Sequence, residues 1–296
     1  MSIFAGQKRC SGKEQNFTCK KVRNSLCAIV GLYIRFAFFF TCLGLLFLQP
    51  FQKTTRAHAA KEPFRKAAIV DHLADSSPNP AFVYECKSLL TKAGYKTDYY
   101  KSEEVTVDFY KKLPTHGYKL IILRVHSAYI PDYLSLAMFT SEPYSKSRYV
   151  YEQLRNRVAS GRIRPDKEGA PRYLVITDKF VRHSMEGAFE DSVIIMMGCT
   201  GVKKCAANAF VEKGAKAYIG WNGLVSSAHT DAATIEFLRR YLLKEQRLGQ
   251  AIGHTMKTLG PDPKHKSVLL YWPINAGGHT FRETTVKSKQ AEETNG

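Results

Sequence analysis

Residues 120–127 read LIILRVHS, an apolar run that ends in His126 and Ser127. A near-continuous apolar run of this kind is typical of a strand buried on both faces of a parallel sheet. A second run, SVIIMM at residues 192–197, leads into Gly198 and Cys199 in the same way. Ligands and reactive groups gather at the carboxyl ends of the strands in such sheets. These two runs therefore indicate both the fold class and the candidate site.

The chain around these runs alternates between apolar strand-like segments and helical spacing. Further strands are predicted at 66–71, 95–100, 172–177, 215–220 and 267–272, and helices at 81–93, 107–113, 202–213, 230–244 and 248–259. The alternation predicts an α/β fold with a mostly parallel sheet and helices on both faces. Residues 140–171 are polar and rich in Arg and Lys, with a predicted helix at 149–158, and we interpret them as an insertion on the core domain.

The chain has 296 residues, of which 44% are hydrophobic and 24% charged, a globular composition. The formal net charge is +18, but nine of the 44 Lys and Arg fall in residues 1–59 together with a single acid, Glu14. The remainder has no block of Lys and Arg interleaved with aromatic residues. Nucleic-acid binding is therefore not expected as the main function.

The N-terminal part predicts export. Residues 26–48 form an apolar segment broken only by Arg35, and basic residues precede it, which favours a cytoplasmic N-terminus. The segment is either a signal peptide, with Ala57-His58-Ala59 as a cleavage site, or a single membrane anchor. A buried core helix is the alternative. We divide the chain into this region at 1–59, an α/β domain at 60–282, and a polar tail at 283–296. The product is an extracytoplasmic domain, secreted or membrane-anchored.

The cysteines fit this division. Four lie in or before the apolar segment, and the exported part keeps Cys86, Cys199 and Cys205. An odd number in an oxidising compartment leaves at least one free thiol.

Cys199 is the candidate nucleophile. The predicted helix at 202–213 begins almost at once after it, and the N-terminus of a helix stabilises a thiolate. If the two strands are neighbours, His126 lies beside the thiol and takes its proton. The alternative is a buried, inert Cys199 and an ordinary surface histidine, because most free cysteines are buried.

Three blocks resemble the caspase-like cysteine peptidases of clan CD, which include caspases, gingipains, clostripain and CHAT-type domains. They are LIILRVHS at 120–127, DSVIIMMGCTG at 191–201 with its following helix, and AKAYIGWNGLVSSAHTDAAT at 215–234. The order, His before Cys, also matches, and the resemblance covers most of residues 67–259. It implies a caspase-like three-layer sandwich.

The resemblance also implies roles. Cys199 is the nucleophile, His126 is the general base and later acid, and the backbone N–H groups of Ser127 and Cys199 form the oxyanion hole. Ser127 stands where the family usually has Gly, and Gly198 stands where Ala or Asp is frequent.

Substrate-binding residues are expected near the same edge. Asp71 ends the strand at 66–71, where the family often has a P1-pocket charge, and an Asp there favours Arg or Lys at P1. Trp221 is a candidate wall of that pocket. The alternatives are a turn-capping Asp71 and a core Trp221. His229 and Asp231 are interpreted as residues at the start of a helix. No metal-binding or cofactor motif is found, so neither is expected.

Three functions remain open. The first is an exported or membrane-tethered cysteine endopeptidase acting on proteins or peptides, with basic P1 residues expected from Asp71. The second is an inactive caspase-like binding or scaffold domain, favoured by Ser127 after His126. The third is a doubly wound ligand-binding domain in which Cys199 is structural. If the enzyme prefers basic P1 residues, the Arg- and Lys-rich segment 148–172 is a candidate site of self-cleavage.

Overall fold

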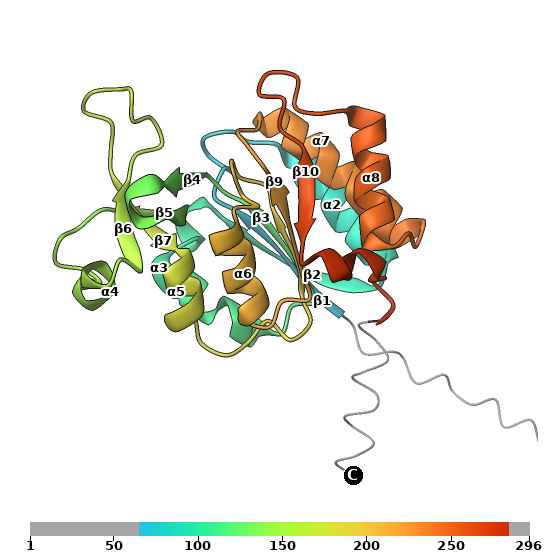
Figure 1. The fold of residues 1–296 in the computed structure, drawn as a ribbon, viewed down its shortest axis with the longest axis horizontal. Helices are drawn as coiled ribbons and strands as arrows, with labels where there is room; N and C mark the ends of the chain where they lie inside the picture. Colours follow the sequence, from blue (N-terminus) through green and yellow to red (C-terminus); the bar gives the residue numbers. More distant parts are fainter. Residues whose placement is uncertain (1–64, 284–296) are drawn as a thin grey trace, which may run out of the picture. The chain divides into compact units, whose positions relative to one another are not determined.

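The computed structural model describes residues 65–283, so the predicted signal or anchor segment at 26–48 and the tail from 284 lie outside the described residues. Six strands form one sheet in the order β10-β9-β8-β3-β1-β2 (Figure 1). Every neighbouring pair is parallel except β9 and β10. The strands are β1 (Arg65–Asp71), β2 (Tyr95–Lys101), β3 (Leu120–Arg124), β8 (Val193–Met196), β9 (Ala217–Trp221) and β10 (Leu269–Trp272). The predicted α/β class with a mostly parallel sheet is confirmed.

Helices cover both faces of this sheet, because alternate residues of each buried strand point to opposite sides. In β1, Ala67 and Ile69 pack with α2, α7 and α8, whereas Ala68 and Val70 face the core that α3, α5 and α6 complete. The helices are α2 (Pro80–Lys92), α3 (Val107–Lys112), α5 (Asp178–His183), α6 (Lys204–Glu212), α7 (Ser227–Leu238) and α8 (Leu248–Leu259). None of these helices, nor any other in residues 65–283, is long and apolar enough to cross a bilayer.

The region interpreted as an insertion, residues 140–171, contributes to a second sheet. Four antiparallel strands follow the order β4-β5-β7-β6. They are β4 (Ser127–Ile130), β5 (Ser135–Pro143), β6 (Val158–Gly161) and β7 (Tyr173–Thr177), with a short helix α4 (Val150–Leu154). The helix predicted at 149–158 is only five residues long. It is followed by a turn with Asn156 at φ +54°, and Val158 then begins β6. The run at 172–177 does form a strand, but in this sheet rather than the parallel one.

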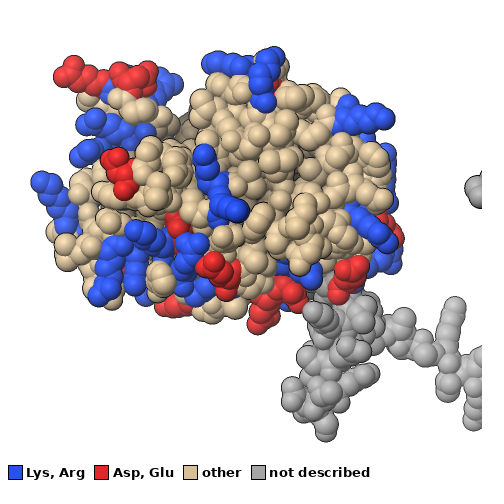
Figure 2. All heavy atoms as spheres, viewed as in Figure 1, with Lys and Arg blue, Asp and Glu red and all other residues tan. Residues whose placement is uncertain are grey.

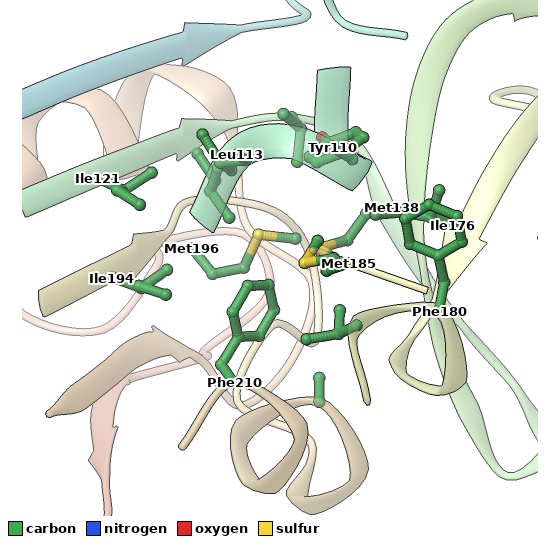
Figure 3. Packing of buried hydrophobic residues seen from close by; sticks show 14 of the residues in the cluster. Tyr110, Leu113, Ile121, Met138, Ile176, Phe180, Met185, Ile194, Met196 and Phe210 are labelled. Carbon is green, nitrogen blue, oxygen red and sulfur yellow. The ribbon is translucent and has the colours of Figure 1, made fainter. Parts of the chain in front are cut away.

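The two sheets share one hydrophobic core. Met138 of β5 and Ile176 of β7 pack in the same cluster as Ile121 of β3 and Met196 of β8 (Figure 3). Tyr110 of α3, Phe180 of α5 and Phe210 of α6 complete the cluster and are all at most 1% exposed. The second sheet is therefore an integral part of the domain, and it holds β4, the strand that begins directly after His126.

Candidate active site

The pairing of β3 with β8 brings His126 and Cys199 to the same edge of the parallel sheet. The two strands are parallel neighbours, with Leu123 opposite Met196. His126 follows Leu123 by three residues, and Cys199 follows Met196 by three residues. The two candidate groups thus leave adjacent strands at equivalent positions, as expected if the strands were neighbours.

A close approach of the two chain segments holds this edge together. Ser127 Oγ donates a hydrogen bond to the carbonyl oxygen of Cys199 at 2.6 Å. A Cβ atom on Gly198 would lie 2.3 Å from Ser127 Oγ and 2.6 Å from the carbonyl oxygen of Val125. Both distances are far below van der Waals contact, so only glycine allows the two segments to lie this close.

The turn after Cys199 differs from the expected geometry. Helix α6 begins at Lys204, five residues after Cys199, so the sulfur does not lie at the helix N-terminus. The intervening turn includes Thr200 at φ +54°, a left-handed conformation that is rare for a β-branched residue. Its N–H donates to the carbonyl of Gly223 at 2.7 Å. The turn is therefore tied to the loop after β9 instead of opening directly into a helix.

The half-buried Cys199 sulfur contacts the backbone of Val225. The Val225 N–H donates to Sγ at 3.5 Å, and the thiol donates to the Val225 carbonyl at 3.8 Å. The sulfur is thus held by the backbone of Val225 and not by a helix end.

Ser127 offers an unpaired backbone N–H on the side facing away from β5. The Phe139 N–H donates to the carbonyl of His126 at 3.0 Å, which makes those two residues a hydrogen-bonded pair. Pairs alternate along an antiparallel ladder, so Ser127 and Met138 form a pair without hydrogen bonds. Because β4 is the edge strand of its sheet, the Ser127 N–H points outward.

His126 lies in an environment that keeps its imidazole neutral. It is half-buried, and its ring contacts those of His72 and Phe139, with centroids 5.8 and 6.2 Å away. Burial lowers the pKa of His126, and the nearby charge of Arg124 lowers it further. A neutral imidazole at physiological pH has a lone pair available to accept a proton.

His72 is a site neighbour that the sequence analysis missed. It follows β1 directly, is 8% exposed, and has no hydrogen-bond partner for Nδ1 in the described part of the chain. Burial, and secondarily the charge of His126, lowers its pKa to about 4. Its position after a predicted strand, as with His126, was the available signal.

Asp71 lies in a buried ion pair. Its carboxylate is 1% exposed and pairs with the fully buried Arg124, Oδ1 to Nη1 at 2.8 Å. Arg124 also binds Asp231 of α7, Nε to Oδ1 at 2.8 Å, and donates to the carbonyl of Ser77. The negative charge of Asp71 is thus balanced by a buried cation, and this residue is corrected from substrate binding to structural pairing.

A cavity of about 430 Å³ includes Asp71 in its lining. Its other walls come from β2 and the start of α2, among them Pro78, Tyr84 and Tyr99. Neither His126 nor Cys199 lines it. The cavity therefore does not restore the P1 role of Asp71.

Trp221 is likewise a core residue. It is 1% exposed, and its indole N–H donates to Thr230 Oγ1 at 2.9 Å. Thr230 in turn donates to the carbonyl of Met197 at 3.1 Å, and the Trp221 ring packs against His229 at 5.3 Å. The predicted role as a pocket wall is corrected: Trp221 joins β9, α7 and the end of β8 beneath the site. Asp231 and His229 lie in the first two turns of α7, as interpreted from the sequence.

Within residues 65–283, no cluster of three or more His, Cys, Asp or Glu side chains is arranged to hold a metal ion. Basic and acidic side chains are mixed around the rim of the face shown in Figure 2, and its centre is mostly uncharged. No protein-family model and no curated protein matches this sequence.

Proposed function

We propose that the chain is an exported or membrane-tethered cysteine endopeptidase with a caspase-like three-layer sandwich, in which Cys199 and His126 form the catalytic dyad. The observation that carries the proposal is the placement of both residues three positions beyond paired residues of β3 and β8. Covalent catalysis needs a base close to the nucleophile, and the carboxyl edge of neighbouring parallel strands is where such groups gather.

In the first step, His126 accepts the thiol proton of Cys199, and the thiolate attacks the carbonyl carbon of the scissile peptide bond. The carbonyl oxygen becomes an oxyanion. The outward N–H of Ser127 and the N–H of Cys199, which has no acceptor among residues 65–283, are the donors for it. Removing one such donor typically costs about 2.7–4 kcal/mol of transition-state stabilisation.

In the second step, the imidazolium of His126 gives its proton to the leaving amine as the C–N bond breaks, which leaves a thioester on Cys199. Water, deprotonated by His126, then attacks the thioester and releases the acid, and the thiol is restored. Because burial and Arg124 lower the pKa of His126, the base stays unprotonated down to a pH below its ordinary value of 6.5. The acid limb of the kcat/KM profile should lie below that pH.

The P1 preference is a separate proposal. The expected preference for basic P1 residues was based on the negative charge of Asp71. Because Asp71 is paired with Arg124, its charge no longer supports this preference. Peptides with Arg, Lys and Asp at P1 therefore need to be compared directly. Export is proposed from the sequence of residues 1–59 alone, and fractionation of cells with N-terminal sequencing of the product tests it. A new terminus at residue 60 identifies a cleaved signal, and an intact membrane-bound chain identifies an anchor.

An inactive caspase-like binding domain is favoured by one specific observation. Both hydrogen-bond contacts of the Cys199 sulfur are to Val225, and none is to His126. In that case the fold presents the same edge as a binding surface without chemistry.

The deciding experiment is the alkylation rate of Cys199 against pH in the full chain. The tryptic peptide 183–203 contains Cys199 and no other cysteine, so mass spectrometry isolates its signal. We expect Cys199 to react faster in wild type than in His126→Ala, because the base takes the thiol proton. Peptide hydrolysis should be lost in Cys199→Ala. A slow reaction that His126→Ala leaves unchanged would overturn the dyad.

A further inference from the structure

The Cys199 sulfur is hydrogen-bonded to a single loop, and the position of that loop depends on the residues that hold its other side. Its two contacts are the N–H and the carbonyl of Val225, in the loop at 222–226 between β9 and α7. The only other tie of this loop to the Cys199 turn is the bond from Thr200 N–H to the Gly223 carbonyl. Whatever holds the far side of the loop therefore decides where the Val225 N–H stands relative to the sulfur.

Asp262 holds that far side. Its side chain is fully buried, and Oδ2 accepts from the N–H and the hydroxyl of Ser226 at 2.9 and 2.6 Å. Oδ1 accepts from the N–H groups of Lys264 and His265 at 3.0 and 2.7 Å. Four donors thus converge on one buried carboxylate. Ser226 follows Val225 directly, so this cluster fixes the residue next to the one that touches sulfur.

A second set of bonds supports the same loop from the same segment. Ser267 Oγ donates to the carbonyl of Leu224 at 2.6 Å, and the Val268 N–H donates to Asn222 Oδ1 at 2.9 Å. The loop is therefore held between the Cys199 turn on one side and residues 262–268 on the other.

We propose that Asp262 is a positioning residue that sets the place of the Cys199 sulfur through Ser226 and Val225. Asp262 does not touch the reacting atoms; it acts by aiming the Val225 N–H. Its effect on kinetics rests on the proposed peptidase function, whereas its effect on the thiol does not.

The carboxylate remains charged throughout the working range of a cysteine peptidase. Burial raises its pKa, but the hydrogen bonds from Ser226 and from the backbone of His265 and Lys264 hold the pKa of Asp262 well below its usual value. The hydrogen bonds of the Asp262 carboxylate therefore persist across this pH range. A substitution of Asp262 thus tests how the carboxylate positions the loop, and not how it titrates.

The test compares Asp262→Asn, Asp262→Ala and Ser226→Ala in the full chain. Ser226→Ala removes one bond to Asp262 and no helix cap, because the Ser226 side chain makes no capping bond to α7. Asp178→Asn is the matched control: Asp178 of α5 is also buried and pairs with Ser135 of β5 and with Arg182 of its own helix, and no hydrogen bond joins it to the loop. The readouts are the alkylation profile of Cys199 against pH, kcat and KM on one peptide substrate, and Tm.

Both Asp262 variants should shift the alkylation profile to higher pH, because the sulfur loses its N–H donor. We expect kcat to fall about 10- to 100-fold, the cost of a small misplacement, with KM changed by less than about threefold. Ser226→Ala should shift the alkylation profile and lower kcat in the same direction, but to a smaller extent than the Asp262 variants. Asp178→Asn should lower Tm and leave the profile and kcat unchanged. Should Asp262→Ala fail to fold, Asp262→Asn and Ser226→Ala carry the test.

A profile and a kcat equal to wild type in Asp262→Asn and Ser226→Ala, with a Tm loss like that of Asp178→Asn, overturns the positioning role. Absence of hydrolysis by wild type together with a shifted profile in Asp262→Asn supports the positioning role but overturns the peptidase. The two failures are thus distinguishable.

Discussion

Ser127 and Cys199 are joined by a hydrogen bond of 2.6 Å in which Ser127 Oγ donates to the Cys199 carbonyl. This bond links the first residue of β4 to the turn that carries the candidate nucleophile. Ser127→Ala removes the bond but keeps the backbone N–H. We expect a loss of about 1 kcal/mol in the free energy of unfolding and a less than tenfold fall in kcat, because about one hydrogen bond is lost and the oxyanion donor stays. Urea unfolding and peptide hydrolysis measure both. A kcat loss near a thousandfold would mean that the hydroxyl itself takes part in the reaction.

Gly198→Ala should be far more damaging than its size suggests. The new Cβ meets Ser127 Oγ and the Val125 carbonyl at distances that force the two segments apart. We expect a loss of about 1–3 kcal/mol, as for other overpacked sites. Gly253→Ala in α8 is the control, since a Cβ there meets nothing within 4 Å, and it should be neutral or stabilising by up to about 1 kcal/mol. Equal effects of the two variants in urea unfolding would contradict the close approach.

The buried His72 predicts a decline of stability in mild acid. Its pKa is about 4 in the folded chain, against an ordinary value of 6.5. Between these two values the unfolded chain binds more protons, so stability is full above pH 6.5 and falls as the pH drops toward 4. At pH 5, protonation of His72 in the unfolded chain lowers the free energy of unfolding by about 2 kcal/mol, from 1.36 kcal/mol per pKa unit.

His72→Phe keeps an aromatic ring and removes the titration. Nδ1 has no partner among the described residues, so the variant loses only the hydrogen bond between the ring and the Thr140 backbone, which lowers stability at both pH values. Urea unfolding at pH 7.5 and pH 5 should show a smaller acid loss in the variant, by about 2 kcal/mol. An identical loss in both proteins would place the acid sensitivity on other groups, such as His126 and His279, whose pKa values are also lowered.

The correction of Asp71 gives a selectivity test. Asp71→Asn weakens the pairing with the fully buried Arg124, and we expect a stability loss of about 3 kcal/mol. The ratio of kcat/KM for Arg against Asp at P1 should stay within about threefold of wild type, since a P1 charge contact is not removed. A hundredfold change in that ratio would return Asp71 to the substrate pocket.

The sequence predicts the parallel sheet well because its central strands β1, β3, β8 and β9 are buried on both faces, and continuous apolar runs mark them directly. Helix α8 (Leu248–Leu259) is also as predicted, because its apolar residues keep one face. The second sheet was not predicted. One reason is that β4 is a short edge strand. Another is that an apolar run such as 172–177 indicates a strand but not the strand with which it pairs. Pairing is decided by the shared core around Met138 and Ile176.

At the site, the strand-end argument placed His126 and Cys199 on one edge, since parallel neighbours end together. The structure does not support the predicted substrate-binding role of Asp71, for a reason that was visible in the sequence. Arg124 interrupts the buried run LIILRV, and a guanidinium there requires buried carboxylates. Asp71 and Asp231 supply them. The prediction that the Cys199 sulfur lies at a helix N-terminus was wrong for a different reason. The sulfur is contacted by the backbone of Val225, and no residue pattern reveals a backbone contact.

A final prediction applies if the comparison of P1 peptides shows a preference for Arg or Lys. Self-cleavage is then expected in the exposed hairpin between β6 and β7. Arg162, Arg164 and Lys167 are exposed there, and exposed loop tips are the preferred sites of nicking. The ladder from Val158–Ile176 to Gly161–Tyr173 holds both ends of the loop, so a cut within it leaves the sheet paired. Intact-mass measurement of the full chain should show new termini between residues 162 and 168 in wild type and an uncut chain in Cys199→Ala.

Replacing Arg162, Arg164 and Lys167 by Gln in one variant separates the action of the enzyme itself from that of a contaminating protease. The triple variant should remain uncut while its hydrolysis of a basic P1 peptide persists, because none of the three residues lies at the proposed dyad. An intact chain in a fully active wild-type preparation would exclude self-cleavage. A cut that persists in Cys199→Ala would assign it to another protease, since only the loss of the nucleophile distinguishes the two sources.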